Sequence, residues 1–206
     1  YAAVVADSLE QARTAAEAAT DLPGLRAAIE AFGLCPLSLT ARNFVFADGP
    51  PDAHVMIVVD APALDEDRQG IPVAGQAAAL LDHMLAAIGL SKTADDPAKS
   101  VYIAPMLPWR PPQDRDPTQD EIAMLAPFMR RHIDLVAPRL LVLMGNHPCQ
   151  GLLDRKGISR LRGNWTQVMD RPAIAMFHPA DLLRNPHEKA RAWDDLLSLQ
   201  AKIRTL

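Results

Sequence analysis

The sequence has little cysteine, few aromatic residues and no long hydrophobic run. Only Cys35 and Cys149 occur among 206 residues, which excludes a disulfide framework and a metal site built on several thiolates. No apolar stretch approaches the roughly 20 residues that cross a membrane, and no signal peptide pattern opens the sequence. We therefore expect a cytoplasmic protein with no membrane partner.

An excess of positive charge is also absent. The chain holds 21 Lys and Arg against 25 Asp and Glu, a net charge of −4, so it is not built to coat nucleic acid indiscriminately. Its 49% hydrophobic and 22% charged residues are typical of a folded globular protein. The densest basic segment, residues 155–162, is interpreted as either a solvated surface or a local contact for a charged partner.

Strand and helix patterns alternate along the chain. Apolar, β-branched runs predict four strands, at residues 54–59, 101–107, 140–144 and 173–177. This alternation predicts the α/β class, with three layers (α/β/α) around a central four-stranded, mainly parallel sheet. We expect residues 1–22 to form an N-terminal helical extension or linker, and residues 23–206 to form the main domain.

Helical signals fill the intervals between these strands. Thr118 and Glu121 form a capping-box pattern that predicts a helix to about residue 137. Helical spacing also predicts helices at 74–90, 146–153 and 187–203, whereas residues 157–163 are expected to be a basic loop. Three polar loops, at 60–68, 109–115 and 178–184, should then meet at the carboxyl ends of the strands, where α/β sheets bind ligands.

Five short motifs carry a family resemblance. They are Asp65–Gly70, Leu80–Asp82, Trp109–Pro112, Gly157–Gly163 and Phe177–Arg184. In this order and spacing the chain, from about Cys35 onward, resembles the uracil-DNA glycosylase superfamily, and in particular its bacterial family 4 branch. The resemblance implies a uracil-DNA-glycosylase-like fold, a link to DNA repair, and single- or double-stranded DNA as a partner.

The resemblance also implies which residues form the site, and several depart from the family pattern. The family motif Gly-Glu-Ala-Pro-Gly corresponds to residues 59–63, where Ala61 and Pro62 are kept and Asp60 replaces the glutamate. Asp60 is a candidate general base for water, or alternatively a helix or loop cap. The Phe that stacks on the base corresponds to Val73, and the Asn that reads its edge corresponds to Pro105.

Two further polar residues match the family motifs. His178 takes the place of the histidine that donates to the developing oxyanion, with a strand-end histidine bonded to a backbone carbonyl as the alternative. Glu66 matches a residue that either contacts substrate or fixes its loop by internal hydrogen bonds. Asp60 and His178 are the catalytic candidates, and the substrate-binding candidates are Ala61, Pro62, Glu66, Val73 and Pro105.

The resemblance also gives candidates for DNA contact. Leu182 and Leu183 correspond to a loop that wedges the minor groove, and simple packing of the following helix is the alternative. The full set of DNA-binding candidates is Arg110, Arg160, Arg162, Leu182, Leu183 and Arg184.

Family 4 proteins usually carry an iron–sulfur cluster on four cysteines. Of these positions only Cys35 is a cysteine here, and the others are Phe32, Trp109 and Leu125. We therefore expect no iron–sulfur cluster, no other cofactor and no metal, with Trp109 and Leu125 filling the volume as apolar packing.

Two hypotheses for function remain open. The first is a catalytically degenerate module that binds DNA or a protein partner. The second is an active glycosylase that hydrolyses the N-glycosidic bond of uracil or another deaminated base with Asp60 and His178. The changes at Val73 and Pro105 favour the first, because they remove base stacking and edge recognition.

Overall fold

Buried apolar strands form the centre of the structure. The computed structural model describes all residues 1–206 and contains one five-stranded sheet in the order β2-β1-β3-β5-β4. β1, β2, β3 and β5 are parallel, and every residue of the first three is buried, as expected for strands covered on both faces. The strands are β1 (Val55–Val59), β2 (Val101–Pro105), β3 (Leu140–Met144), β4 (Trp165–Val168) and β5 (Arg171–Met176).

The expected α/β class is confirmed, but the expected number of strands is wrong. β4 is a fifth strand that runs antiparallel to β5 at the edge of the sheet. It has only four residues, of which Thr166 and Gln167 are exposed, so it leaves no apolar run in the sequence. Met169 and Asp170 join it to β5 with φ of 51° and 63°, a two-residue turn without the glycine that normally signals a hairpin.

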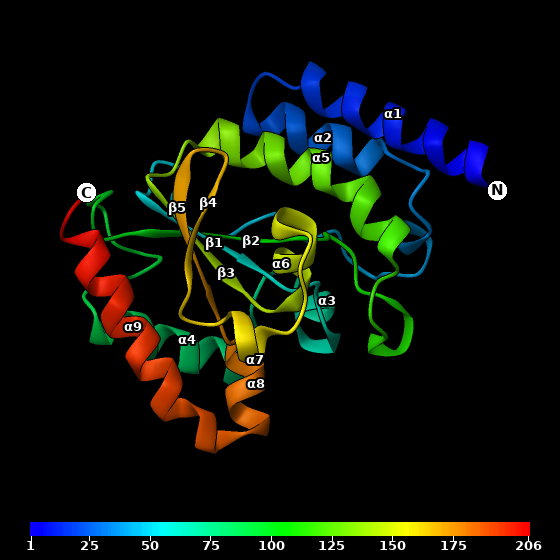
Figure 1. Cartoon of the computed structure of the whole chain (residues 1–206). Helices are drawn as coiled ribbons and strands as arrows, with labels where there is room; N and C mark the ends of the chain where they lie inside the picture. Colours follow the sequence, from blue (N-terminus) through cyan, green and yellow to red (C-terminus); the bar gives the residue numbers. More distant parts are fainter.

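Helices cover both faces of the sheet (Figure 1). One layer contains α1, α2 and α5, and the other contains α4, α8 and α9. Residues 157–163, expected to be a loop, include the one-turn helix α7. The helices are α1 (Ala2–Ala18), α2 (Leu22–Ala31), α3 (Leu64–Gln69), α4 (Gly75–Ala87), α5 (Gln119–Val136), α6 (Asn146–Leu153), α7 (Ile158–Leu161), α8 (Pro179–Arg184) and α9 (Lys189–Ile203). No helix is long and apolar enough to cross a membrane.

The N-terminal helix α1 packs along α5 (Figure 1). Ala12 and Ala16 are buried in the same hydrophobic core as the strands, and Arg131 of α5 donates its Nε–H to the carbonyl of Ala19 at 2.8 Å. The boundary at residue 22 remains a prediction, and α1 contributes side chains to the shared core.

The capping box at the start of α5 is confirmed. Glu121 N–H donates to Thr118 Oγ1 at 3.1 Å, and Thr118 N–H donates to Glu121 Oε2 at 2.8 Å. The same Glu121 carboxylate also accepts two hydrogen bonds from the Arg115 guanidinium, at 2.7 and 3.0 Å. This charged pair connects the loop after β2 to the first turn of α5.

A polar pair lies in the core between β2 and α5. His132 is 3% exposed, stacks on Phe46 with ring centroids 4.5 Å apart, and its Nε2 lies 2.7 Å from the Tyr102 hydroxyl. Burial lowers the pKa of His132 to about 3 and raises the pKa of Tyr102. His132 is therefore neutral in the folded protein throughout the ordinary pH range.

We expect His132 to make stability depend on pH. The pKa of His132 in the folded protein lies below its unfolded value of about 6.5. The contribution of the neutral ring to the free energy of unfolding is therefore complete above about pH 6.5 and is lost as the pH falls towards 3. His132→Gln should flatten the stability profile in this window, measured as urea unfolding free energy at several pH values. His83→Gln, a change at an exposed histidine, is the control. An unchanged slope in His132→Gln would contradict the assignment.

Candidate functional site at the carboxyl ends of the strands

A cavity of about 200 Å³ opens at the carboxyl ends of the strands. The strand order reverses beside β1, since β2 lies on one side of it and β3 on the other, and such a switch point is the usual ligand site of an α/β sheet. The three loops expected to converge each contribute to it. Its walls are formed by Asp60, Ala61, Pro62, Ala63, Glu66, Pro72, Pro111, Asp114, Arg115, Asp116, His147, His178, Ala180 and Arg184.

Asp60 follows β1 directly and lies in this cavity. Its Oδ1 accepts a hydrogen bond of 3.0 Å from the backbone N–H of His147, in the first turn of α6. Gly145, with φ of +114°, leaves room for the Asp60 carboxylate, because a Cβ at residue 145 would lie 2.2 Å from Asp60 Oδ1. Asp60 is thus a cap for α6 and a wall of the cavity at once.

His147 lies in the cavity and was missed by the sequence analysis. Its Nδ1 accepts a 3.0 Å hydrogen bond from the backbone N–H of Ala61, and its Nε2 lies 3.7 Å from Asp116 Oδ1. Since Nδ1 is an acceptor, the neutral ring carries its proton on Nε2. His147 follows β3 by three residues, so applying the strand-end rule to β3 as well would have identified it.

His178 is buried at the start of α8 and also lines the cavity. Its Nδ1 accepts a 3.0 Å hydrogen bond from the N–H of Ala180, so Nε2 holds the proton. The expected alternative, a bond to a backbone carbonyl, is not what the structure has. Nε2–H has no hydrogen-bond partner in the chain, which leaves a fixed donor available to a ligand.

The acidic residues after Asp60 hold their own loop. Glu66 Oε1 accepts from the N–H of Ala74 at 3.2 Å, and the Asp67 carboxylate accepts from the N–H groups of Arg42 and Asn43 at 2.9 Å each. Both carboxylates are buried, and Glu66 lines the cavity as well. Glu66 therefore fixes the loop, and its second oxygen has no hydrogen-bond partner in the chain.

Two of the substrate-binding candidates lie outside the cavity. Val73 is 3% exposed and packs in a crevice with Leu81 and Ile103. Pro105 ends β2, pairs with Val59 in the sheet, and faces a small apolar crevice on the α5 side. Ala61 and Pro62, in contrast, form part of the cavity wall.

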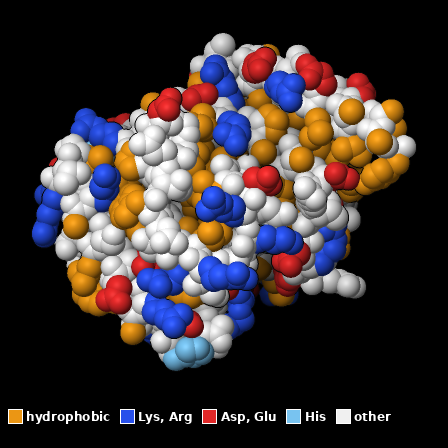
Figure 2. Space-filling view, viewed as in Figure 1, with side chains coloured by type: hydrophobic (Ala, Val, Ile, Leu, Met, Phe, Trp, Pro, Cys, Tyr) orange, Lys and Arg blue, Asp and Glu red, His pale blue; other side chains and the backbone are white.

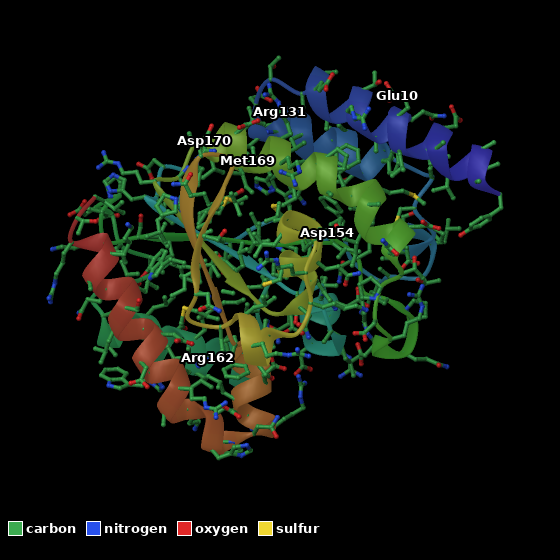
Figure 3. All side chains as sticks on the ribbon, in the orientation of Figure 1. Glu10, Arg131, Asp154, Arg162, Met169 and Asp170 are labelled. Carbon is green, nitrogen blue, oxygen red and sulfur yellow. The ribbon has the colours of Figure 1, made fainter.

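The basic candidates differ in how far they are already paired. Arg162, labelled in Figure 3, makes two hydrogen bonds, of 2.8 and 2.6 Å, with the buried Asp195 of α9, and this pairing raises the pKa of Arg162. Arg110 pairs in the same manner with Asp114, at 2.7 and 3.1 Å. Arg184 pairs with Asp181 and lines the cavity, whereas Arg160 is exposed and its guanidinium has no partner.

One group of exposed cations reaches the cavity through Arg184. Figure 2 shows Lys and Arg side chains gathered over the region of α7, α8 and the start of α9. We call this group the basic patch, and its exposed members are Arg155, Lys156, Arg160, Arg184, Lys189 and Arg191. Of the two wedge candidates, Leu182 is 1% exposed and packs in the core, while Leu183 is 39% exposed. Only Leu183 can reach DNA without unfolding α8.

The positions that correspond to the cluster cysteines do not fit an iron–sulfur cluster. Phe32, Cys35, Trp109 and Leu125 are all buried in the hydrophobic core and supply a single thiol. Burial raises the pKa of Cys35 to about 11 and that of Cys149 to about 12, so both thiols are protonated at neutral pH. No group of three or more metal-ligating side chains occurs elsewhere in the chain.

We expect Gly145→Ala to be more destabilising than Gly157→Ala. Both glycines have φ above +100°, so each change costs about 1–3 kcal/mol of backbone strain. Only at Gly145 would the new Cβ also displace Asp60, whereas nothing lies within 4 Å at Gly157. Urea unfolding of both variants measures the difference, which should be about 1–3 kcal/mol because Asp60 loses its hydrogen bond to His147. Equal losses would show that Asp60 moves aside freely.

Comparisons with known proteins identify the family of this chain. Residues 46–197 match the family described as "Uracil DNA glycosylase superfamily". A type-4 uracil-DNA glycosylase of Archaeoglobus fulgidus is 34% identical over 161 residues, which are 74% of this chain and 78% of that protein. Proteins of the same name from Sulfurisphaera tokodaii and Thermotoga maritima are 33% and 32% identical, over 74% and 76% of this chain and 71% and 80% of their own lengths. The chain therefore belongs to the uracil-DNA glycosylase superfamily.

Proposed function

We propose that this protein binds DNA in the context of repair and receives an everted base in the cavity beside Asp60, without excising uracil selectively. One observation carries the proposal: no Phe, Tyr or Trp ring and no side-chain amide line the cavity. Stacking on an aromatic ring is worth about 1–3 kcal/mol per base, and recognition of the base edge by a side-chain amide is lost. Val73 and Pro105, at the corresponding positions, lie in other crevices.

Binding to DNA is supported by the relatives and by charge. The similar proteins are named uracil-DNA glycosylases, whose substrate is DNA. The basic patch includes Arg184, which lines the cavity, and its cations would neutralise phosphates although the chain as a whole carries a charge of −4. The exposed Leu183 is the candidate wedge beside an everted base.

The direct test combines excision and binding. Purified protein is incubated with single- and double-stranded oligonucleotides that carry one uracil, and abasic sites and affinity are measured. We expect salt-dependent binding and no abasic sites. Uracil release that His178→Ala abolishes would contradict the proposal, and the absence of any salt-dependent binding would point to a protein partner instead.

Arg160 and Arg162 should respond differently to removal. Arg160→Ala deletes an exposed, unpaired cation, so DNA affinity should fall several-fold and the salt dependence should weaken by about one phosphate contact, with stability unchanged. Arg162→Ala leaves Asp195 buried without its partner and should cost about 3 kcal/mol of stability. Thermal unfolding and fluorescence anisotropy on labelled DNA measure the two effects. The reverse pattern would exclude Arg160 as a phosphate contact.

A second candidate function is excision of another deaminated base. The observation that favours it is the free Nε2–H of His178 in the same cavity as Asp60. Asp60 would take a proton from a water that attacks the sugar carbon C1′. The N-glycosidic bond would break with its electron pair going to the base, and His178 would donate a hydrogen bond to the carbonyl oxygen that gains charge.

The second candidate predicts release of hypoxanthine or xanthine. Both Asp60→Asn and His178→Asn should then lower the rate at least a hundredfold, because each removes one contact to the transition state. His178→Asn keeps an acceptor for the Ala180 N–H, so the fold of α8 should survive. Abasic sites are counted after alkaline cleavage. Full activity in either variant would remove that residue from the mechanism.

A further inference from the structure

Two histidines in the cavity are held in the same state. His147 Nδ1 accepts the N–H of Ala61, and His178 Nδ1 accepts the N–H of Ala180, each at 3.0 Å. Both rings therefore carry the proton on Nε2. For His147 the nearest acceptor is Asp116 Oδ1 at 3.7 Å, beyond hydrogen-bond distance, and Asp116 is fully exposed. The Nε2–H of His147 is thus a fixed donor that the protein itself does not use.

Acceptors lie in the same cavity. Asp60 uses Oδ1 for the His147 N–H, and Glu66 uses Oε1 for the Ala74 N–H. The second oxygen of each carboxylate has no hydrogen-bond partner in the chain. No hydroxyl, amide, Phe, Tyr or Trp side chain lines the cavity, and its two guanidinium groups are already paired, Arg115 with Glu121 and Arg184 with Asp181. Among the side chains of the wall, the donors and acceptors left for a ligand are therefore imidazole N–H groups and carboxylate oxygens.

The length of the His147 side chain is informative. A short acceptor such as the amide oxygen of asparagine would satisfy the N–H of Ala61 equally well. The imidazole adds a second nitrogen beyond that contact, and His147 is one of the residues that line the cavity. The Nδ1 atom alone satisfies the backbone N–H of Ala61, so the rest of the ring adds one further group, the Nε2–H donor.

We propose that His147 is a specificity-determining residue that donates its Nε2–H to a ring carbonyl of a base with an imide edge, O=C–NH–C=O. The ring N–H of that base would donate to the free carboxylate oxygen of Asp60 or Glu66, a charge-assisted hydrogen bond. This assignment rests on the proposed function, in which the cavity receives an everted base. Uracil has this edge, whereas cytosine presents an acceptor and an amino group in place of the N–H and one carbonyl.

Two variants separate the ligand contact from the structural one. His147→Asn keeps an acceptor for the Ala61 N–H and removes the Nε2–H donor. His147→Gln places an amide near the position of Nε2 and removes the acceptor at Nδ1. The first should lose specificity and keep stability, and the second should lose stability and keep part of the specificity.

The probes are oligodeoxyadenylate strands that carry either one uracil or one cytosine. The ratio of their dissociation constants is measured for each protein by fluorescence anisotropy, and thermal unfolding is measured in parallel. We expect wild type to prefer the uracil strand, and His147→Asn to reduce this preference about tenfold, the value of one hydrogen bond of about 1.4 kcal/mol. An unchanged preference in His147→Asn, or binding of both strands with equal affinity by wild type, would overturn the assignment.

If the protein does not bind DNA, so that the proposed function fails, a second measurement tests the role of His147 directly. If wild type binds neither strand, free uracil and free cytosine are titrated while the imidazole ¹⁵N signals are followed. A shift of the His147 Nε2 signal with uracil and not with cytosine would support the assignment, although DNA binding had failed. No shift with either base would overturn it.

Discussion

The pocket depends on two hydrogen bonds that cross between the ends of β1 and β3. The Asp60 carboxylate accepts the backbone N–H of His147, and the His147 imidazole accepts the backbone N–H of Ala61. The two segments, which are more than 80 residues apart in the sequence, thus satisfy each other's backbone N–H groups. Both donors lie where the chain leaves a strand, and an unpaired buried N–H there would be costly. The positions of the carboxylate and the imidazole therefore follow from a requirement of the backbone.

This reciprocal cap explains the neighbouring residues. The Asp60 carboxylate lies so close to the chain after β3 that only a glycine fits at residue 145. Glu66 and His178 are fixed by backbone N–H groups of their own, from Ala74 and Ala180. Asp60, Glu66, His147 and His178 thus each use one side-chain atom to bind a backbone N–H, and the second polar atom of each has no hydrogen-bond partner in the chain.

The sequence predicts the parts of the fold that depend on local chemistry. The parallel strands are apolar runs, the start of α5 is a capping box, and the meeting of the polar loops follows from strand direction. β4 is missed because Thr166 and Gln167 face solvent and its turn has no glycine. The tautomer of His147 and the pairing of Arg162 with Asp195 depend on contacts between distant segments, which no local pattern carries.

Four residues that depart from the family pattern lie either in the hydrophobic core or in small apolar crevices. Trp109 and Leu125 are buried in the core, where hydrophobic volume is what the fold needs. Val73 and Pro105 are likewise absorbed into apolar crevices, so the loss of their polar or aromatic counterparts leaves the sheet intact. The cavity itself keeps its imidazole and carboxylate groups. The changes at these four positions therefore lie in apolar packing, outside the wall of the cavity.

The fixed tautomers also determine how the cavity would respond to transition metals. A histidine binds a metal through a nitrogen that carries no proton, and in both His147 and His178 that nitrogen already accepts a backbone N–H. Coordination through Nε2 would require the proton to move to Nδ1, where it would face the N–H of Ala61 or Ala180. A cavity with two imidazoles and several carboxylates thus resists capture by zinc or nickel, and it stays available to uncharged organic groups.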